Sequence, residues 1–576
     1  MAILQPLIDL AELFFQHGLR HVVLSPGSRS AALSLAFIRH GGFKIQVLID
    51  ERSAAFVGLG IAQQLQQPTI LICTSGSAAY NFAPAIAEAF FQQVPLLVLT
   101  ADRPKEWIHQ YDGQTIFQQG IFGKHVKADF EFPADYSHPD AVWHINRTAN
   151  EAFLRATTEP YGPVHINVPI REPFYPEPGE TWKASRQIRK IGQIKTNIEL
   201  NITQWHSLLD TWDSYDRILI AIGQQPWNNT NWDSLANLAS DLAIPIVADI
   251  TANINLPEHV VRHHDLFLGI TRDERLLPEL LITTGMSFVS KSLKLFLREN
   301  PAVVHWHIGT DGSIADPLQS LSQIIPVSPT YFFDILYEKI DFQNFVENQE
   351  PDGREAYFAL WEDYDMKSRI LLHRYLKKIE TLNDLTALDL ILSRLGSHYI
   401  LQVGNSMPIR YVNALSIENI DTARVYANRG TSGIDGCLST AIGAALATDL
   451  PVYLVLGDLS FLYDRNGLLI KELPVNLKII ILNNGGGDIF TMIDGPGRLS
   501  ENATYFRNTH PYTAENTAKD AGITYIAASN IGELEQGFDS IKRLPNCALL
   551  EVFTDSADNQ AAWKGLRAFM KAHLSV

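Results

Sequence analysis

The sequence predicts an α/β protein made of three consecutive domains, each with a doubly wound, mostly parallel sheet. Two observations indicate this fold class. Short apolar runs of strand length alternate with helix-like segments along the chain, which is typical of parallel sheets joined by crossover helices. The chain also has 576 residues, of which 46% are hydrophobic, so it holds enough apolar material for several cores.

In the predicted first domain, residues 1–184, each apolar run ends in a turn of small and polar residues. The runs are HVVLSPGSRS (21–30), KIQVLIDERS (44–53), TILICTSGSAAYN (69–81) and PLLVLTADRP (95–104). Doubly wound sheets bind ligands at the carboxyl ends of their strands. The polar residues at these ends are therefore candidate ligand contacts: Ser28, Arg29, Glu51, Thr74, Ser75 and Arg103.

A proline-rich, charged stretch at 173–200 has no periodicity and predicts a linker to a second domain, residues 185–350. The predicted strands of this domain are RILIAIG (217–223), IPIVADI (244–250), LLITTG (280–285) and AVVHWHIG (302–309). No GxGxxG motif follows any of them, so we do not expect a dinucleotide there.

A charged, helix-like stretch at 340–380 is interpreted as a second connector, and the predicted third domain covers residues 351–576. The predicted strands of this domain are YILQVGNS (399–406), RVYANRG (424–430), PVYLVLGD (451–458), LKIIILNN (477–484) and ALLEVF (548–553). The chain therefore contains a third α/β unit of the same kind.

The charge and the cysteine content exclude several classes of protein. The formal net charge is −17 without a basic run, so we expect neither nucleic acid nor an anionic membrane as a partner. The three cysteines, Cys73, Cys437 and Cys547, are too scattered for a disulfide framework. The first residues do not resemble a secretory signal, and no window approaches about 18 uninterrupted apolar residues, so the expected location is cytoplasmic.

The strongest chemical pattern lies at the ends of two consecutive predicted strands of the third domain. One strand ends in Gly457 and Asp458, and the next ends in Asn483 and Asn484 before a run of glycines. Carboxylate and amide oxygens suit Mg²⁺, which usually shares its coordination shell with phosphates. Glycines let a backbone carbonyl turn inward and a diphosphate come close. Asp458 could simply cap a helix, and the Asn-Gly run could be a simple turn. The occurrence of both at the ends of consecutive strands favours a metal site.

A GD pair followed about 25 residues later by NN is the pattern of thiamine-diphosphate-dependent enzymes, although Leu459 stands where that pattern usually has Gly. Four segments closely resemble the family of 2-succinyl-5-enolpyruvyl-6-hydroxy-3-cyclohexene-1-carboxylate synthases. They are GDLSFLYDRNGL (457–468), NRGTSGIDG (428–436), SPGSRS (25–30) and TADRP (100–104). The resemblance covers essentially the whole chain and implies the thiamine-diphosphate-enzyme fold.

The resemblance implies a pyrimidine-binding first domain, a central domain without cofactor, and a diphosphate- and metal-binding third domain. The implied ligands of Mg²⁺ (or Mn²⁺) are Asp458, Asn484 and the carbonyl of Gly486. The cofactor would lie between the first domain of one subunit and the third domain of another, which requires a homodimer or homotetramer. The implied contacts of thiamine diphosphate are Glu51, Thr74, Ser75, Ser406, Ile434, Asp458, Leu459, Ser460, Asn484 and Gly486.

Glu51 is the implied catalytic residue. It follows an apolar strand and precedes a helix of small residues, where partial desolvation would favour its protonated form. In thiamine enzymes such a glutamate bonds the pyrimidine ring and promotes the imino tautomer that deprotonates the thiazolium. A surface glutamate at the start of a helix is the ordinary alternative. Ile434 matches the aliphatic residue that props the bent cofactor.

The resemblance also implies two substrates, 2-oxoglutarate and isochorismate, which are dianions of the kind that arginine forks bind well. Arg410 and Arg429, assisted by Ser406, match the contacts of 2-oxoglutarate. The implied contacts of isochorismate are Ser28, Arg29, Arg103, Gln114 and Lys291. The family often has a Lys-Arg pair where this chain has Lys291 and Ser292, so one anion contact is expected to come from elsewhere.

The implied reaction is decarboxylation of 2-oxoglutarate and conjugate addition of the resulting succinyl-semialdehyde carbanion to isochorismate, in menaquinone or phylloquinone synthesis. One alternative is another thiamine-diphosphate-dependent 2-oxoacid decarboxylase or carboligase of the acetolactate synthase kind, which would not need so many arginines. The other is a non-catalytic thiamine-fold protein. Ile489 and Phe490 are candidate walls of the substrate pocket. Asn483 is assigned no role beyond shaping the turn. His109 and His125 lie near the expected substrate region, but the cofactor's own amino group can handle the proton transfers, so a histidine is not required.

Overall fold

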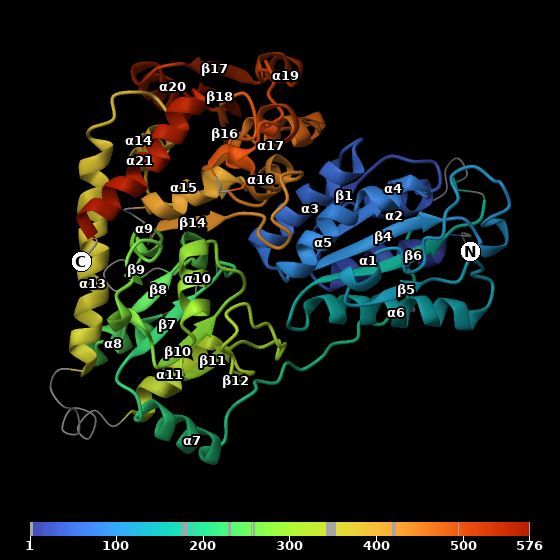
Figure 1. Ribbon diagram of the computed structural model, residues 1–576. Coiled ribbons are helices and arrows are strands. Elements are labelled where there is room, and N and C mark those ends of the chain that lie inside the picture. The colour runs from blue at the N-terminus through green and yellow to red at the C-terminus, as the bar shows by residue number, and fades with distance from the viewer. Residues whose placement is uncertain are drawn as a thin grey trace.

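The computed structural model describes residues 4–574 except 173, 177–181, 187, 228–231, 255, 257–259, 341–352, 418–421 and 493–494. Over these residues the chain forms three six-stranded sheets in succession, and all of their strand pairs are parallel. Figure 1 shows the first domain set beside the other two. The predicted fold class is confirmed, while the limits 1–184, 185–350 and 351–576 stay a prediction.

The first sheet has the strand order β2-β1-β3-β4-β6-β5. Its strands are β1 (His21–Leu24), β2 (Lys44–Val47), β3 (Thr69–Cys73), β4 (Leu96–Asp102), β5 (Asp129–Glu131) and β6 (Pro163–Pro169). Its helices are α1 (Gln5–Gln16), α2 (Ala31–His40), α3 (Glu51–Leu65), α4 (Ser77–Asn81), α5 (Ala83–Phe91) and α6 (Pro139–Thr157). The direction of winding reverses between β1 and β3, so a ligand crevice is expected beyond these two strand ends.

The second sheet has the strand order β12-β11-β10-β7-β8-β9. Its strands are β7 (Ile218–Ile222), β8 (Ile246–Ala248), β9 (Val260–Val261), β10 (Leu280–Thr284), β11 (Val304–Ile308) and β12 (Gln323–Ile325). Its helices are α7 (Ile202–Trp212), α8 (Asp233–Leu242), α9 (His264–Phe267), α10 (Lys291–Glu299) and α11 (Pro329–Lys339).

The winding of this second sheet reverses between β7 and β10, and the loops after these strands bond to each other there. Gly223 N donates to Thr284 O at 2.9 Å, Gln224 N donates to Ser287 O at 3.1 Å, and Met286 N donates to Gln224 O at 2.8 Å. These loops occupy the place where a doubly wound sheet usually binds its ligand.

The third sheet has the strand order β14-β13-β15-β16-β18-β17. Its strands are β13 (Tyr399–Val403), β14 (Ala423–Tyr426), β15 (Val452–Gly457), β16 (Leu477–Asn483), β17 (Thr524–Ala528) and β18 (Ala548–Phe553). Its helices are α13 (Gly353–Leu376), α14 (Asp384–Arg394), α15 (Met407–Leu415), α16 (Cys437–Leu446), α17 (Asp458–Asp464), α18 (Ile489–Met492), α19 (Glu515–Asp520), α20 (Ile531–Arg543) and α21 (Ser556–Leu574). Its winding reverses between β13 and β15, beside Ser406 and Asp458.

Consecutive residues of the third sheet face different neighbours. Ile479 and Ile481 of β16 pack into a core shared with the first domain, whereas Ile480 and Leu482 pack into a core shared with the second domain. Successive side chains of a strand point to opposite faces of the sheet. Both faces of the sheet are therefore buried at β16, which is why residues 479–482 form an uninterrupted apolar run.

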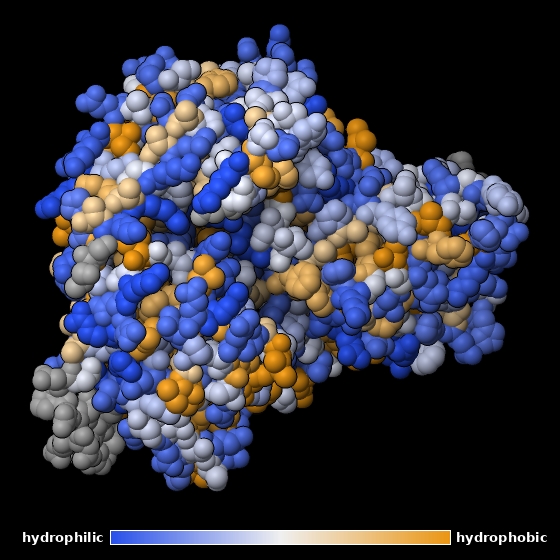
Figure 2. Space-filling model, viewed as in Figure 1, coloured by the Kyte–Doolittle hydropathy of each residue, from blue (hydrophilic) through white to orange (hydrophobic). Residues whose placement is uncertain are grey.

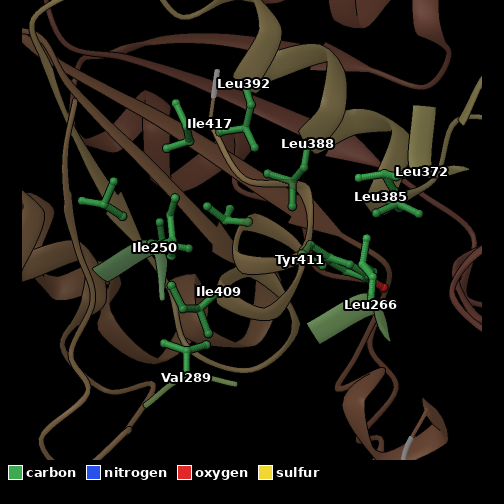
Figure 3. Close-up of a cluster of buried hydrophobic side chains, with 14 of the residues drawn as sticks. Ile250, Leu266, Val289, Leu372, Leu385, Leu388, Leu392, Ile409, Tyr411 and Ile417 are labelled. Atoms are coloured by element: carbon green, nitrogen blue, oxygen red, sulfur yellow. The ribbon is translucent and has the colours of Figure 1, made fainter. Parts of the chain in front are cut away.

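Figure 3 shows part of the core shared by the second and third domains. Ile250, Leu266 and Val289 from the second domain belong to one buried cluster with Leu388 and Tyr411 from the third. Burying such side chains stabilises the fold by roughly 1.5–3 kcal/mol each. The two domains are thus joined by a continuous apolar core.

Two segments between the sheets are interpreted from the sequence as connectors. The described residues between β6 and α7 form neither helix nor strand, as a linker requires. The interpretation is wrong for α13, because Tyr357, Trp361 and Tyr364 on this helix are buried in the core of the second and third domains. Residues 341–352 lie outside the described residues.

Helices α3 and α16 join the first domain to the third within one chain. A Cβ atom on Gly60 would lie 2.0 Å from the carbonyl oxygen of Thr440, and one on Gly443 would lie 2.0 Å from that of Val57. Only glycine permits this approach of two backbones, so the small residues of α3 serve an interdomain contact.

The surface agrees with the acidic, polar character of the sequence. Figure 2 shows hydrophilic residues spread over this face of the molecule, interrupted by smaller apolar patches. Among the described helices, none combines the length and the apolar character needed to span a bilayer.

Asp464 is a buried carboxylate at the contact of the first and third domains. It accepts hydrogen bonds from Ser439 N at 2.7 Å, Ser439 Oγ at 2.8 Å and Ser53 Oγ at 3.4 Å. Burial raises the pKa of Asp464 to about 7. An aspartate in an unfolded chain has a pKa of about 3.9, so the folded state holds this proton over a wider pH range.

We expect the contribution of Asp464 to the free energy of unfolding to fall as the pH rises from about 4 to about 7, because in this window its carboxyl keeps the proton in the folded state and loses it in the unfolded state. Asp464→Asn removes this titration. The thermal unfolding midpoint of the variant should therefore rise relative to that of the wild type between about pH 5 and about pH 8. A difference between the two midpoints that does not change with pH would contradict the assignment.

Candidate active site

Two neighbouring strand ends of the third sheet meet at Asp458. Because β15 and β16 are adjacent parallel strands, the residues that follow them lie side by side. The Asp458 carboxylate accepts hydrogen bonds from Leu459 N at 2.6 Å and Gly486 N at 2.9 Å. Asp458 is buried, and burial raises the pKa of its carboxyl to about 6. The structure therefore brings together Asp458 and the glycine run, as the sequence predicts.

The two asparagines at the end of β16 have different surroundings. Asn483 Nδ2 donates to Glu551 Oε1 at 2.7 Å, and its Oδ1 accepts from Gly485 N at 3.1 Å. Asn484 Nδ2 donates to Asp384 Oδ2 at 3.1 Å, whereas its Oδ1 is buried without a hydrogen-bond partner. Since a buried carbonyl oxygen without a partner is costly, Asn484 is suited to a ligand and Asn483 to holding the turn.

Arg507 connects the two ends of the glycine run, and no sequence pattern identified it. Its Nε donates to Asp488 Oδ1 at 2.9 Å and its Nη2 donates to Asn484 O at 2.8 Å. Its carbonyl oxygen accepts from Gly487 N at 2.6 Å. Gly486 has φ of 155°, and a Cβ there would lie 2.8 Å from Arg507 O. Glycine is required because the arginine backbone lies against it.

The donors at these strand ends fit a small divalent cation that binds together with a diphosphate. They are the Asp458 carboxylate, Asn484 Oδ1 and the Gly486 carbonyl, all of them hard oxygen ligands. In the part of the chain that the structure describes, no three His, Cys, Asp or Glu side chains group closely enough to hold a metal ion. A metal at this place therefore needs amide, carbonyl and phosphate oxygens as well.

The loop 428–436 carries Arg429 and Ile434 and is held by other parts of the third domain. Asn405 Nδ2 donates to two carbonyl oxygens of the loop, at 2.6 Å each. Ser460 Oγ donates to the Ile434 carbonyl at 3.0 Å, which places Ile434 beside the helix that begins at Asp458.

Glu88 of α5, in the first domain, binds the same loop. This buried carboxylate accepts from Gly430 N at 2.7 Å, Thr431 N at 2.6 Å and Thr431 Oγ1 at 2.5 Å. Glu88 was not identified from the sequence, although a single charge within the apolar helix APAIAEAFF is a usable signal. The first domain therefore contributes to the position of Arg429 within the same chain.

Three cations gather between the second and third domains. Arg410 Nη1 donates to the Ser406 carbonyl, Arg429 Nη1 donates to Asn405 Oδ1 at 3.0 Å, and Lys294 Nζ donates to the Phe288 carbonyl at 3.0 Å. Burial lowers the pKa of each, and the charge of Arg429 further lowers the pKa of Arg410 and of Lys294.

None of these three cations forms an ion pair with a carboxylate of the described residues. Lys294 was not identified from the sequence, which favoured Lys291 on the same helix. Lys291 is exposed, whereas Lys294 is half-buried. A cluster of unpaired, partly buried cations is suited to an anionic substrate.

Arg29 and Arg103 lie together at the strand ends of the first sheet. Arg29 is buried and its Nη1 donates to Ile170 O at 3.0 Å. Burial, and then the charge of Arg103, lowers the pKa of Arg29. Arg103 Nη1 pairs with Asp112 Oδ2 at 2.6 Å and its Nε donates to Gly113 O at 3.1 Å.

The remaining predicted residues of the first domain lie in loops near the carboxyl ends of the same sheet. Thr74 and Ser75 follow β3 and are buried, and their hydroxyls have no hydrogen-bond partner. Ser28 and Gln114 are exposed. A Cβ on Gly76 would lie 3.3 Å from Gln114 Cα, so Gln114 lies next to the loop that carries Ser75.

Glu51 is the first residue of α3, not the last residue of a strand, because β2 ends at Val47 and Asp50 caps the helix through Arg52 N at 2.9 Å. Its Oε2 accepts from Asn81 Nδ2 at 3.3 Å. The side chain is half-buried.

Glu51 lines a depression of about 450 Å³ with Ile49, Asn466 and Leu469. Asp458 does not line this depression, and no hydrogen bond joins Glu51 to Asp458 or Asn484 among the described residues.

Ile489 and Phe490 begin α18, one residue after the glycine run, and both are half-buried. The ring of Phe490 lies 6.1 Å from that of Phe506. His109 and His125 are exposed, and their ring contacts are with aromatic residues of the first domain. These contacts assign neither histidine to the cation clusters or to the strand ends at Asp458.

Comparison with protein families gives matches at both ends of the chain. Residues 9–125 match the family described as thiamine pyrophosphate enzyme, N-terminal TPP binding domain. Residues 413–552 match the thiamine pyrophosphate enzyme, C-terminal TPP binding domain. The two matched segments contain the strand ends that carry Arg29, Arg103, Asp458 and Asn484, whereas Ser406 and Arg410 lie before the second segment.

Similar proteins match over nearly the whole chain. The 2-succinyl-5-enolpyruvyl-6-hydroxy-3-cyclohexene-1-carboxylate synthase of Cytophaga hutchinsonii is 41% identical over 566 residues, covering 97% of this chain and 98% of the relative. The synthase of the same name from Flavobacterium johnsoniae is 36% identical over 570 residues, covering 98% of each. The structure of benzoylformate decarboxylase from Polynucleobacter necessarius has a TM-score of 0.72 over 96% of this chain and 98% of its own, with 14% identity, a likeness of fold alone.

Glu88→Ala is expected to loosen the loop 428–436, because it removes the charged acceptor of the hydrogen bonds that Gly430 N and Thr431 N donate. Each such loss costs about 1–3 kcal/mol, so amide hydrogen exchange in a peptide containing these residues should accelerate roughly 10-fold or more. Glu535→Gln, at an ion pair with Arg394, is the control. Unchanged protection in the Glu88 variant would show that the loop does not depend on this carboxylate.

Proposed function

The chain belongs to the family of 2-succinyl-5-enolpyruvyl-6-hydroxy-3-cyclohexene-1-carboxylate synthases, and we propose that it forms this product and CO₂ from 2-oxoglutarate and isochorismate. Its cofactors are thiamine diphosphate and Mg²⁺ or Mn²⁺, and its pathway is that of menaquinone or phylloquinone. One observation of the site supports this most strongly. Oxygen donors for a metal and the cations Arg410 and Arg429 lie in the same domain, at neighbouring strand ends.

Thiamine diphosphate supplies an electron sink for the decarboxylation of a 2-oxoacid. The protein's own residues hold the reactants. Asp458, Asn484 Oδ1 and the Gly486 carbonyl bind the metal, and Ile434, Leu459 and Ser460 lie against the cofactor. Arg410, Arg429 and Lys294 bind the carboxylates of 2-oxoglutarate, because unpaired, partly buried cations favour a dianion over water.

The isochorismate dianion is assigned to the first domain and the start of α10. The residues of this second set are Ser28, Arg29, Arg103, Gln114 and Lys291. Two adjacent arginines suit two carboxylates, and the buried Arg29 keeps a fixed orientation through its hydrogen bond to Ile170 O. Ile489 and Phe490 form an apolar wall that keeps water from the reacting carbon.

A homodimer, alone or as half of a homotetramer, would complete the site. Within one chain Glu51 shares neither a hydrogen bond nor a pocket with Asp458, and Glu51 of a second copy would reach the cofactor bound to the third domain. Support comes from the apolar surface around Glu51, where Ile49 is 72%, Leu469 56% and Tyr463 53% exposed. Apolar side chains grouped around a charged depression are typical of an interface.

The alternative of an acetolactate-synthase-like enzyme has less support. A substrate with a single carboxylate does not need cation clusters in both the first and the third domain. The fold similarity to benzoylformate decarboxylase concerns architecture and does not extend to the substrate.

The direct test is turnover of isochorismate with 2-oxoglutarate, thiamine diphosphate and Mg²⁺, followed by the loss of isochorismate absorbance. We expect turnover with all four components and none when one is omitted. Glu51→Gln should lower kcat by about 10²-fold or more, since the contribution of a proton-transfer group is of this order, with an unchanged circular dichroism spectrum. A folded wild type without turnover would refute the function, and near wild-type kcat in the variant would refute the role of Glu51.

One set of cations is assigned to 2-oxoglutarate and the other to isochorismate. Replacing a cation of one set should therefore raise the Michaelis constant of its own substrate more than that of the other substrate. Arg410→Ala and Lys294→Met should weaken the use of 2-oxoglutarate, by roughly 10-fold or more for a lost charge-assisted hydrogen bond of about 1.5–3 kcal/mol. Lys291→Met, one turn away on the same helix, should weaken the use of isochorismate instead. Equal changes in both Michaelis constants for any of these variants would show that the division is wrong.

A further inference from the structure

We propose that Asp384 is a positioning residue that orients the Asn484 carboxamide so that its oxygen, and not its nitrogen, faces the metal. The proposal rests on the proposed function, because it concerns the metal of that site. Asp384 begins α14, 100 residues before Asn484, and no sequence pattern connects the two.

The need for such a residue follows from the chemistry of asparagine. A carboxamide has an oxygen and an NH₂ group of similar size at its two ends, and rotation about χ2 exchanges them. The oxygen can bind a cation, whereas the NH₂ group is a donor and repels it. An asparagine ligand is therefore reliable only if another group accepts a hydrogen bond from its nitrogen.

Asp384 provides this acceptor. Its Oδ2 lies 3.1 Å from Asn484 Nδ2, and its Oδ1 accepts from Thr554 Oγ1 at 2.7 Å. An ionised carboxylate only accepts hydrogen bonds, so the flipped amide would place two oxygens against each other. The Oδ1 of Asn484 is then left buried and without a partner, directed away from Asp384. Both carboxylate oxygens of Asp384 accept a hydrogen bond, so Asp384 holds Asn484, which is the residue that faces the metal.

The orientation of Asp384 is itself fixed by a closed ring of hydrogen bonds. Asp384 N donates to Asn559 Oδ1 at 2.7 Å, and Asn559 Nδ2 donates to Asp488 Oδ2 at 3.2 Å. Asp488 Oδ1 accepts from Arg507 Nε at 2.9 Å, and Arg507 Nη2 donates to Asn484 O at 2.8 Å. The ring returns to the asparagine where it began, so it holds both the side chain and the main chain of Asn484.

The ring is buried, so its hydrogen bonds are protected from competition by water. Asp384 is 2%, Asn559 1% and Asp488 3% exposed. Water cannot replace a lost partner at such depth, so each donor depends on the acceptor that the fold supplies. Groups that hold the ligands of a metal commonly contribute about 10- to 100-fold to metal affinity, and Asp384 holds this position for Asn484.

The test measures Mn²⁺ affinity by electron paramagnetic resonance, in the presence of thiamine diphosphate and without substrates. Asp384→Ala should weaken Mn²⁺ binding about 10- to 100-fold. Asp384→Asn should retain most of the affinity, because its amide oxygen can still accept from Asn484 Nδ2. Asp365→Asn, a carboxylate of α13 that accepts from Arg262 N and His263 N, is the control for a general loss of stability and should bind as the wild type does.

A double variant separates orientation from structure. Asn484→Asp has oxygens at both ends of its side chain, so its orientation no longer matters, but beside Asp384 it brings two carboxylates together. We expect the single variant Asn484→Asp to bind Mn²⁺ weakly and the double variant Asp384→Ala/Asn484→Asp to bind more tightly than either single variant. Additive losses in the double variant, or wild-type affinity in Asp384→Ala, would overturn the proposal. A wild type that binds no Mn²⁺ with thiamine diphosphate would refute the proposed function instead.

Discussion

The third sheet is buried on both faces, between two cores that are continuous with those of the first and second domains, and the arrangement of the site depends on this constraint. Alternate side chains of β16 enter the core shared with the first domain or the core shared with the second. A strand so enclosed cannot shift in register without moving every apolar side chain to the wrong face. The end of β16, with Asn484 and the glycine run, therefore has a fixed position relative to Asp458 at the end of β15.

The polar contacts around the site extend this rigidity from backbone to side chains. Glu88 binds the loop of Arg429 from the first domain, and Arg507 binds both ends of the glycine run. Among the buried polar groups without a hydrogen-bond partner, Asn484 Oδ1 and the hydroxyls of Thr74 and Ser75 lie at strand ends where a ligand is expected. The middle domain, whose switch point is closed by its own loops, instead completes the cation cluster through Lys294.

Much of the fold followed from local patterns. Apolar runs of strand length with turns of small residues identified the main strands of each sheet, and the GD and NN pairs identified the strand ends that meet at the candidate metal site. The prediction was wrong for the segment at 340–380, because a helix with charged residues on one side can still bury Tyr357, Trp361 and Tyr364 on the other. The strand before Glu51 is shorter than predicted, since Asp50 caps α3 and Glu51 already lies in the helix.

By itself, the sequence determined the fold class, the family resemblance and the residues at the strand ends, because strand periodicity, glycine runs and paired polar residues are local properties of the chain. Only the tertiary structure decided which groups support those residues. Asp384 reaches Asn484, Glu88 reaches Thr431 and Lys294 joins Arg410 across long separations in sequence. Contacts of this kind arise from the packing of domains against one another, and their energy depends on burial, which no short stretch of sequence specifies.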